Sequence, residues 1–347
     1  MSTALRILVT GAGSVVGQGI AKALRISGLD YRLIMADIGP LNAGLFRSDE
    51  AVILPAVEAA GALEGIVDVL RQREVHVLFL GSEFDIAFYA AHREEIERRS
   101  GATVVVSPPE TIALANDKLC TARFLAQHGW PAPMSVDASD PDAACQEAER
   151  MGFPVILKPR SGTSSRHVHI VRTSSELRHL LPLVPSPMVQ ELLAHSNASS
   201  LGSEYTCSIF KDPTGQILGP IIARWRLRGG SSWIVEVCHR PDFVPLLHDI
   251  GQALNIVGSL NVQLIETADG PVPFEFNARF SGTTAIRAHF GFNEPEMAVR
   301  ACRLGERLPH PTIRPGLCLR YEEEIFLDGL SASSDLLQHR GIVHPWF

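Results

Sequence analysis

The chain has 347 residues, which is enough for two or three domains and a sizeable hydrophobic core. Its 46% hydrophobic and 20% charged residues are typical of an ordinary soluble globular protein. A net charge of −7 and a pI near 6.0 argue against a general nucleic-acid binder, because such proteins carry an excess of positive charge.

The cysteines and the N-terminal segment indicate the cellular compartment. The six cysteines are scattered and form no CxxC pair, a pattern typical of reduced thiols. The opening MSTALRILVTGAG lacks the long apolar core of a signal peptide, and no apolar run reaches membrane-spanning length. We therefore expect a cytoplasmic protein whose partners are small molecules rather than nucleic acid or membrane.

Strands alternate with helices over roughly the first 110 residues. Because such alternation is typical of parallel sheets, residues 1–112 are predicted to form a doubly wound α/β domain. The predicted strands are LRILVT, YRLIMADI, HVLFLG and TVVVS, and the predicted helices are IAKALRISG and the segment 85–100.

The next part of the chain, residues 113–310, mixes antiparallel strands with helices and is predicted to be α+β. One or two helices are expected in PPETIALANDKLCTARFLAQHG, which Gly129 and two prolines end. Residues 311–347 are taken as a C-terminal segment, of which the last stretch, 331–347, has no clear assignment. The predicted strands are FPVILKP, MVQELL, SEYTCSIFKD, GPIIARWRLRGG and WIVEV, followed by the hairpin SLNVQLIETADGPVPFEFNARF.

A glycine-rich turn follows the first strand. Gly11, Gly13 and Gly17 have the spacing GxGxxxG, and Asp37 ends the next strand. Such a turn can approach a diphosphate while the acid binds a ribose, which would suit an NAD(P)-dependent oxidoreductase. However, no tyrosine is followed by the Tyr-x-x-x-Lys spacing of short-chain dehydrogenases. We therefore favour a tight turn that binds no dinucleotide.

The stretch FEFNARF at 274–280 carries polar side chains at alternate positions. In an extended strand, Glu275, Asn277 and Arg279 share one face and the phenylalanines share the other. If TADG forms a three-residue turn with Gly270 left-handed, the hairpin pairs Thr267 with Pro271. Its polar face then places Gln263 opposite Glu275 and Asn261 opposite Asn277.

This polar face predicts a magnesium site. One carboxylate among amide oxygens suits Mg²⁺, which completes its coordination with water and substrate phosphates. Two of the chain's four lysines are placed to meet those phosphates. Lys158 ends an apolar strand before a loop of small residues, and Lys118 begins a separate helix.

Taken in order, these motifs resemble the ATP-grasp superfamily, in its carbamoyl-phosphate-synthetase-large-subunit-like branch. The resemblance extends over nearly the whole chain. It lies in VTGAGSVVGQGIAKAL, SPPETIALANDKL, FPVILKPRSGTSS, VQELL, GSEYT, NVQLIE, FEFNARFSGTT and LCLRYEEEIFLDG. The chain departs from the family in a phosphate loop with a single glycine and in NAR where NPR is common.

The resemblance implies a Rossmann-like pre-ATP-grasp domain at 1–112 and an ATP-grasp domain at 113–310, with a mobile lid at about 133–190. It implies ATP and Mg²⁺ as cofactors and leaves a homodimer open. Arg279 would meet the transferred phosphoryl group together with Lys158. The implied ATP contacts are Lys118, Lys158, Ser161, Gly162, Thr163, Ser164, the hinge Gln190, Glu191, Leu192 and Leu193, and Glu204 at the ribose; the implied metal residues are Glu275 and Asn277, supported by Gln263.

Two further groups are candidates for substrate contact. Arg228 precedes Gly229 and Gly230, in a region that lies beside the acceptor in related ligases. There arginine can stabilise an acyl phosphate or position a carboxylate, so Arg228 is also a candidate catalytic residue. Ser82 and Glu83 follow a parallel strand, at the edge where open sheets bind ligands. The alternatives are an exposed basic strand for Arg228 and the start of a helix for Ser82.

The sequence therefore predicts an ATP-dependent carboxylate–amine ligase that forms an amide or peptide-like bond through an acyl phosphate. Two alternatives stay open: use of bicarbonate, as in carboxylases and carbamoyl-phosphate synthesis, and the NAD(P)-dependent oxidoreductase. A non-catalytic nucleotide-binding protein is disfavoured, because the predicted metal residues form a complete set.

Overall fold

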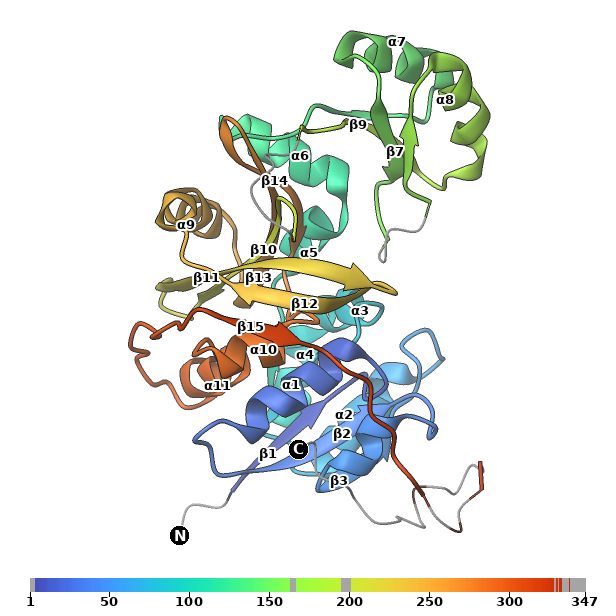
Figure 1. The fold of residues 1–347 in the computed structure, drawn as a ribbon. Helices are drawn as coiled ribbons and strands as arrows, with labels where there is room; N and C mark the ends of the chain where they lie inside the picture. Colours follow the sequence, from blue (N-terminus) through green and yellow to red (C-terminus); the bar gives the residue numbers. More distant parts are fainter. Residues whose placement is uncertain are drawn as a thin grey trace.

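The computed structural model describes residues 4–162, 167–194, 201–327, 329, 331–332 and 337. Three sheets follow one another along the chain (Figure 1). In the part described, no helix is long and apolar enough to cross a membrane.

The first sheet is parallel, as predicted, and has five strands in the order β3-β2-β1-β4-β5. Its short third strand and the helix after it were not predicted, although the buried residues Ala62, Ile66, Val67 and Leu70 of that helix have helical spacing. The strands are β1 (Leu5–Val9), β2 (Tyr31–Asp37), β3 (Glu50–Ile53), β4 (Val77–Phe79) and β5 (Thr103–Val105). The helices are α1 (Val15–Arg25), α2 (Ala62–Gln72), α3 (Ile86–Ala91) and α4 (Arg93–Ser100).

Two helices lead to the second sheet, which is antiparallel with the order β6-β9-β7-β8. Its buried residues form a separate hydrophobic cluster with two helices (α7 and α8), and Figure 1 shows this unit standing apart at the upper right. The helices are α5 (Pro109–Asn116), α6 (Lys118–Gln127), α7 (Pro141–Met151) and α8 (Ser174–Leu180). The strands are β6 (Ser135–Asp137), β7 (Val155–Pro159), β8 (His169–Val171) and β9 (Pro187–Glu191).

The third sheet is also antiparallel and has six strands in the order β14-β13-β10-β11-β12-β15. Its last strand comes from the C-terminal segment 311–347 and was not predicted. The strands are β10 (Glu204–Lys211), β11 (Ile217–Arg228), β12 (Ser231–Val237), β13 (Gly258–Thr267), β14 (Gly270–Asn277) and β15 (Gly316–Leu319). The helices are α9 (Val244–Ala253), α10 (Thr284–His289), α11 (Glu294–Ala298) and a π-helical turn (Val299–Arg303).

The parallel sheet and the six-stranded sheet share their hydrophobic cores. One cluster joins Leu8 and Ile34 to Tyr205 and Leu260, and the other joins Ile7 to Phe210. The two sheets therefore pack as one body, whereas the four-stranded sheet has its own core. The predicted division at residues 112 and 310, with a lid at 133–190, stays a prediction.

Candidate functional site

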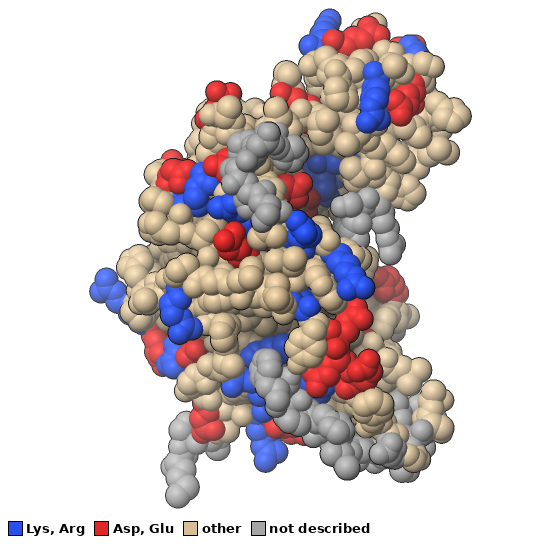
Figure 2. Space-filling view, in the orientation of Figure 1, with Lys and Arg blue, Asp and Glu red and all other residues tan. Residues whose placement is uncertain are grey.

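A cavity of about 640 Å³ lies where the three sheets meet. Its walls come from the four-stranded sheet, the six-stranded sheet and the end of β4. Figure 2 shows acidic and basic side chains together in the hollow beneath the upper-right unit. Of the predicted site residues, the cavity is lined by Ser82, Glu83, Lys118, Lys158, Ser161, Gly162, Gln190, Glu191, Leu192, Leu193, Glu204, Gly229, Gly230, Gln263, Glu275, Asn277 and Arg279. Thr163 and Ser164 lie outside the described residues.

Lys158 is buried at the end of β7, with 6% of its surface exposed. Its Nζ donates to Gln190 Oε1 at 2.7 Å and lies 5.8 Å from the centre of the Phe274 ring. Burial lowers the pKa of Lys158 to about 8, although the charge of Glu275 opposes this shift. The ammonium is thus poorly solvated, and an anion beside it would stabilise its charge.

Lys118 reaches the same place from α6. Asp117 caps this helix by accepting from the backbone N–H groups of Leu119 and Cys120, so Lys118 is the first helical residue. Its Nζ donates to Gly162 O at 2.9 Å and lies 3.9 Å from Glu275 Oε2. Both lysines therefore feel the charge of Glu275, since Lys118 pairs with this carboxylate and its charge raises the pKa of Lys158.

The hairpin has the predicted pairing at its polar end, with Gln263 opposite Glu275 and Asn261 opposite Asn277. Asn277 Nδ2 donates to Glu275 Oε1 at 3.2 Å, which turns the Asn277 carbonyl oxygen away from Glu275. Among the described residues, no three His, Cys, Asp or Glu side chains gather as a metal cluster. A cation here would need the amide oxygens, and this donor set fits Mg²⁺ better than a soft metal.

The predicted three-residue turn is wrong. Thr267 pairs with Gly270 rather than with Pro271, so the connection has two residues. A bulge then adds Phe274 to β14 and restores the pairing of Gln263 with Glu275. The bulge also turns Phe274 into the cavity, whereas Phe276 is buried on the opposite face as predicted.

The predicted hinge lies along β9 and the residues that follow it. Gln190 is buried and spans Lys158 and Ser135, since its Nε2 donates to Ser135 Oγ at 2.8 Å. The Glu191 carboxylate accepts from Met134 N at 3.1 Å. Both polar side chains are therefore engaged by protein groups, and recognition of a base here would rest on the backbone and on apolar contacts.

Arg228 is not among the residues that line the cavity. Arg224, Arg226 and Arg228 share one face of β11, as predicted, but the cavity is lined by the opposite face, with Trp225 and Leu227. The Arg228 guanidinium lies over the ring of Trp233, 4.5 Å from its centre. The structure brings Gly229 and Gly230 to the site without Arg228, so it gives no support to a catalytic role for this arginine.

Ser82 is not the N-cap of α3, because Asp85 holds that position, and its role in substrate contact stays a prediction. Its Oγ accepts from Phe84 N at 3.3 Å and donates to Asp85 Oδ1 at 3.3 Å, and so closes the turn before α3. Ser82 and Glu83 nevertheless line the cavity. The turn therefore holds Glu83 at the edge of the site.

Backbone atoms of the protein and the Asp37 side chain pack against the glycine turn. A Cβ on Gly17 would lie 2.2 Å from Gly11 O, and one on Gly81 would lie 2.2 Å from Thr10 O. Gly13 N donates to Asp37 Oδ2 at 2.8 Å, so the acid expected to bind a ribose is held by the turn. These contacts explain the glycines by close backbone packing and favour the tight-turn interpretation.

Several lining residues were missed from the sequence. Thr206 lies two positions after Glu204, and strand alternation could have found it. Ile156 and Ile170 pair across β7 and β8 and form an apolar roof, a signal that short apolar strands do not distinguish from core packing. Ser14, Val15 and Val16 bring the start of α1 to the cavity.

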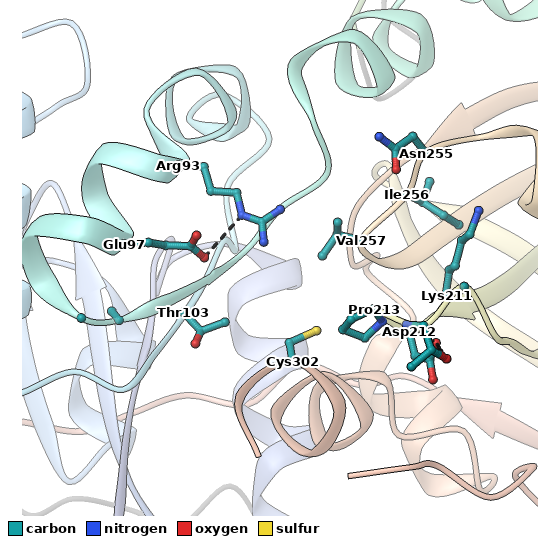
Figure 3. Close-up of a pocket in the computed structure, with 14 residues that line it drawn as sticks. Arg93, Glu97, Thr103, Lys211, Asp212, Pro213, Asn255, Ile256, Val257 and Cys302 are labelled. Atoms are coloured by element: carbon teal, nitrogen blue, oxygen red, sulfur yellow. Dashed lines mark hydrogen bonds and ion pairs between the residues drawn. The ribbon is translucent and has the colours of Figure 1, made fainter. Parts of the chain in front are cut away.

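A second cavity, of about 740 Å³, lies between α4, β5 and the turn after β10 (Figure 3). Its charged groups are already partnered. Arg93 pairs with Glu97 at 3.4 Å, and Lys211 Nζ donates to Gly251 O and Leu254 O at 3.1 and 3.0 Å. Burial raises the pKa of Cys302 to about 11, which keeps this thiol protonated. The cavity thus carries little chemistry.

Comparison with known proteins agrees with this geometry. Residues 189–325 match the family described as ATP-grasp in the biosynthetic pathway with Ter operon. The chain is 23% identical over 300 residues to the carbamoyl phosphate synthase large chain of Methanoregula boonei, which covers 80% of the chain and 28% of that protein. It is 23% identical over 337 residues to the C-terminal section of the Methanopyrus kandleri carbamoyl phosphate synthase large chain. This alignment covers 90% of the chain and 60% of that protein. The chain is thus similar in sequence to an ATP-grasp family over residues 189–325 and to carbamoyl phosphate synthase large chains over most of its length.

Solved structures confirm the predicted ATP-grasp fold class. The biotin carboxylase domain of Hydrogenobacter thermophilus 2-oxoglutarate carboxylase, a dimer in complex with MgADP, ADP and bicarbonate, is 16% identical. The alignment covers 91% of this chain and 74% of that one, with a TM-score of 0.71. N5-carboxyaminoimidazole ribonucleotide synthetase from Thermus thermophilus is 18% identical. That alignment covers 88% of this chain and 81% of the synthetase, with a TM-score of 0.70. The chain spans 28% of the length of the Methanoregula boonei relative and 60% of that of the Methanopyrus kandleri relative.

Proposed function

We propose that this protein is an ATP- and Mg²⁺-dependent ATP-grasp carboxylate–amine ligase that forms an amide or peptide-like bond. The proposal rests on one observation: groups suited to phosphate and Mg²⁺ line the same cavity. They are Lys118, Lys158, Arg279, the Glu275 carboxylate and the amides of Asn277 and Gln263. These elements come from separate parts of the chain, and ordinary packing does not require them to meet.

Each group has a distinct role in the proposal. Lys118 and Lys158 bind the nucleotide phosphates under the loop that begins at Ser161. Glu275, Asn277 and Gln263 hold Mg²⁺, which neutralises phosphate charge when bound. The backbone of Gln190–Leu193 and the apolar roof bind adenine, and Glu204 binds the ribose. Arg279 meets the γ-phosphoryl group and the acid.

The chemistry needs no covalent enzyme intermediate. A carboxylate oxygen of the acid attacks the γ-phosphorus, the bond from that phosphorus to the bridging oxygen breaks, and ADP leaves. The amine nitrogen then attacks the acyl carbon, the acyl C–O bond breaks with its electron pair going to phosphate, and the nitrogen loses a proton. Positioning and fixed positive charge supply the catalysis. Closure of the lid, about 133–190, would exclude water from the acyl phosphate.

The decisive experiment measures ADP release with Mg²⁺ while amino acids, sugar acids and small amines are varied. Release that requires an acid, and an amide product that requires an amine, would support the proposal. Glu275→Gln must abolish this release. ADP release that persists in that variant would refute the metal assignment.

Bicarbonate is the second candidate for the activated acid. It is favoured by one observation, namely that the similar biotin carboxylase domain is described in complex with bicarbonate. ADP release that depends on bicarbonate alone, with no response to organic acids, would select this candidate. Because that domain is a dimer, a homodimer is part of the proposal, and sedimentation equilibrium tests it.

A further inference from the structure

A buried ion pair lies beneath the proposed metal residues. Arg287 on α10 and Glu294 on α11 are 2% and 0% exposed, and Arg287 Nη1 lies 3.4 Å from Glu294 Oε1. Neither residue lines the cavity, and no motif in the sequence singled them out. The pair nevertheless contacts the floor of the site.

The contact runs through Thr206 and Asn261, which both line the cavity. Arg287 Nη2 donates to Thr206 Oγ1 at 3.1 Å and also to Asn261 Oδ1. Thr206 Oγ1 donates to the same Asn261 oxygen at 2.7 Å. Because a guanidinium can only donate, the Asn261 carbonyl oxygen has to face Arg287. The positions of the oxygen and the nitrogen in the Asn261 side-chain amide are thereby assigned.

The amide nitrogen of Asn261 is consequently the end turned away from Arg287. Within the described residues, the side chain of Asn261 forms its hydrogen bonds to Thr206 and Arg287 through the oxygen, and none through Nδ2. An amide that the sequence alone would count as an oxygen ligand is instead held as an N–H donor. A donor in a cavity of this kind suits an anionic oxygen rather than a cation.

Stability does not account for the buried pair. Glu294 Oε1 accepts from Ser208 Oγ at 2.6 Å and from Ser259, but Glu294 Oε2 is buried without a partner in the described part of the chain. An orphan carboxylate oxygen costs free energy, and apolar residues often replace a buried ion pair without loss. A functional constraint on the orientation of Arg287 explains why the pair is kept.

The register shows which part of the substrate this donor would meet. Asn261 lies two residues beyond Gln263, about 7 Å along β13, and opposite Asn277. The β10 end that carries Glu204 pairs with Ile265, in the other direction. Asn261 therefore lies away from the proposed ribose end and towards Arg279, where the terminal phosphoryl group and the acid would meet.

We propose that Arg287 is a positioning residue, with Glu294 as its counter-ion, which locks Asn261 as a hydrogen-bond donor to an oxygen of the terminal phosphoryl group. The proposal rests on the proposed function, since it presupposes a bound nucleoside triphosphate. It adds a residue that acts without touching the substrate.

The first test measures binding of MgADP and of a non-hydrolysable ATP analogue with Mg²⁺ by calorimetry. Asn261→Asp keeps the oxygen that Arg287 needs but replaces the donor with a carboxylate. The expected result is about tenfold weaker binding of the analogue, the effect of one lost hydrogen bond to a charged group, with the affinity for MgADP changed by less than about twofold. The matched control is Asn255→Asp in the second cavity, which should change neither affinity.

The second test separates positioning from folding. Arg287→Lys keeps the charge but loses the planar fork, and the double variant Arg287→Met with Glu294→Gln removes both charges. Both should lose about tenfold in affinity for the analogue alone, and the double variant should unfold within about 5 °C of the parent.

Four results would overturn the proposal. Unchanged analogue binding in Asn261→Asp would show that the amide donates to nothing, and unchanged binding in both Arg287 variants would show that Asn261 needs no positioning. If the Arg287 variants lost affinity equally for MgADP and for the analogue, with a large fall in Tm, the pair of Arg287 and Glu294 would be purely structural. If the parent protein bound neither nucleotide, the proposed function itself would fail, and this inference with it.

Discussion

Glu83 and Arg279 form an ion pair across the edge of the cavity, with Glu83 Oε2 2.7 Å from Arg279 Nη2. Glu83 follows β4 of the parallel sheet, whereas Arg279 follows β14 of the six-stranded sheet, 196 residues later in the chain. The arginine proposed to meet the phosphoryl group is therefore neutralised by the protein before any substrate arrives.

Replacing Glu83 should release this arginine. Glu83→Gln is expected to bind the Mg²⁺ complex of a non-hydrolysable ATP analogue about three- to tenfold more tightly, because the anion no longer competes with a carboxylate. Arg279→Gln should weaken binding of the analogue by a similar factor, and calorimetry measures the affinity of both variants. Weaker binding in Glu83→Gln would mean that Glu83 serves to orient Arg279 rather than to compete for it.

Removing the single carboxylate of the proposed metal cluster should uncouple nucleotide binding from Mg²⁺. We expect Glu275→Gln to lose most of the extra thermal stabilisation that MgADP gives over ADP alone, because the remaining ligands are neutral amides. Thermal unfolding with and without EDTA measures this difference. Glu147→Gln, a change at a carboxylate of α7 that pairs with Arg150, is the control and should retain the full Mg²⁺ effect.

The lowered pKa of Lys158 predicts a specific pH dependence of stability. Folding lowers this pKa from 10.5 to about 8, so between these values the unfolded chain binds more protons and the stability of the folded protein rises with pH. Below pH 8 the cost of the buried charge is present in full. Relative to Lys158→Met, the parent should thus gain up to about 3 kcal/mol in unfolding free energy between pH 7 and pH 10.5.

Denaturant unfolding of the two proteins across this range provides the measurement. A difference that stays flat with pH would show that Lys158 titrates normally. Nucleotide binding should follow the opposite trend, since a neutral lysine has to take up a proton to pair with phosphate. The affinity for MgADP should therefore fall above pH 8 in the parent, and Lys158→Met should bind weakly at every pH.

The glycine turn predicts a stability defect without a dinucleotide effect. Gly17→Ala should destabilise the fold by about 3 kcal/mol or more, because its Cβ would meet the Gly11 carbonyl oxygen at 2.2 Å. Gly39→Ala is the matched control, since its Cβ would meet nothing within 4 Å. Neither NAD⁺ nor NADPH should raise the Tm of the parent, and a clear rise with either would restore the oxidoreductase interpretation.

The sequence predicted the elements of the site better than their junctions. Strand alternation was enough to place Gln263, Glu275 and Asn277 on one face, because every second side chain of an extended strand points to the same side of the sheet. The turn length was wrong and the pairing was nevertheless correct, since the bulge at Phe274 compensates by one residue. Nothing local in the sequence distinguishes a bulged from a regular hairpin of this composition.

Which face of a strand meets the cavity was harder to predict than the strand itself. The sequence indicated the arginine face of β11 as the candidate substrate-binding face, but Trp225 and Leu227 on the opposite face line the cavity. The buried Arg287 was missed for the same reason: its function depends on what packs against it, and that is fixed only by the tertiary fold. The short strand β3 carried too little periodicity to be predicted.

The strand pairing of the four-stranded sheet brings its two ends together. This unit begins with β6 and ends with β9, and these strands pair directly, with Ser135 opposite Gln190. The chain therefore enters and leaves the unit at neighbouring positions, and Arg160 of the same unit adds a third connection by pairing with Asp117 at the start of α6. Gln190 bridges Ser135 and Lys158 at the point where the chain enters and leaves, so a change in the pairing of β6 with β9 would alter the surroundings of the Lys158 ammonium group.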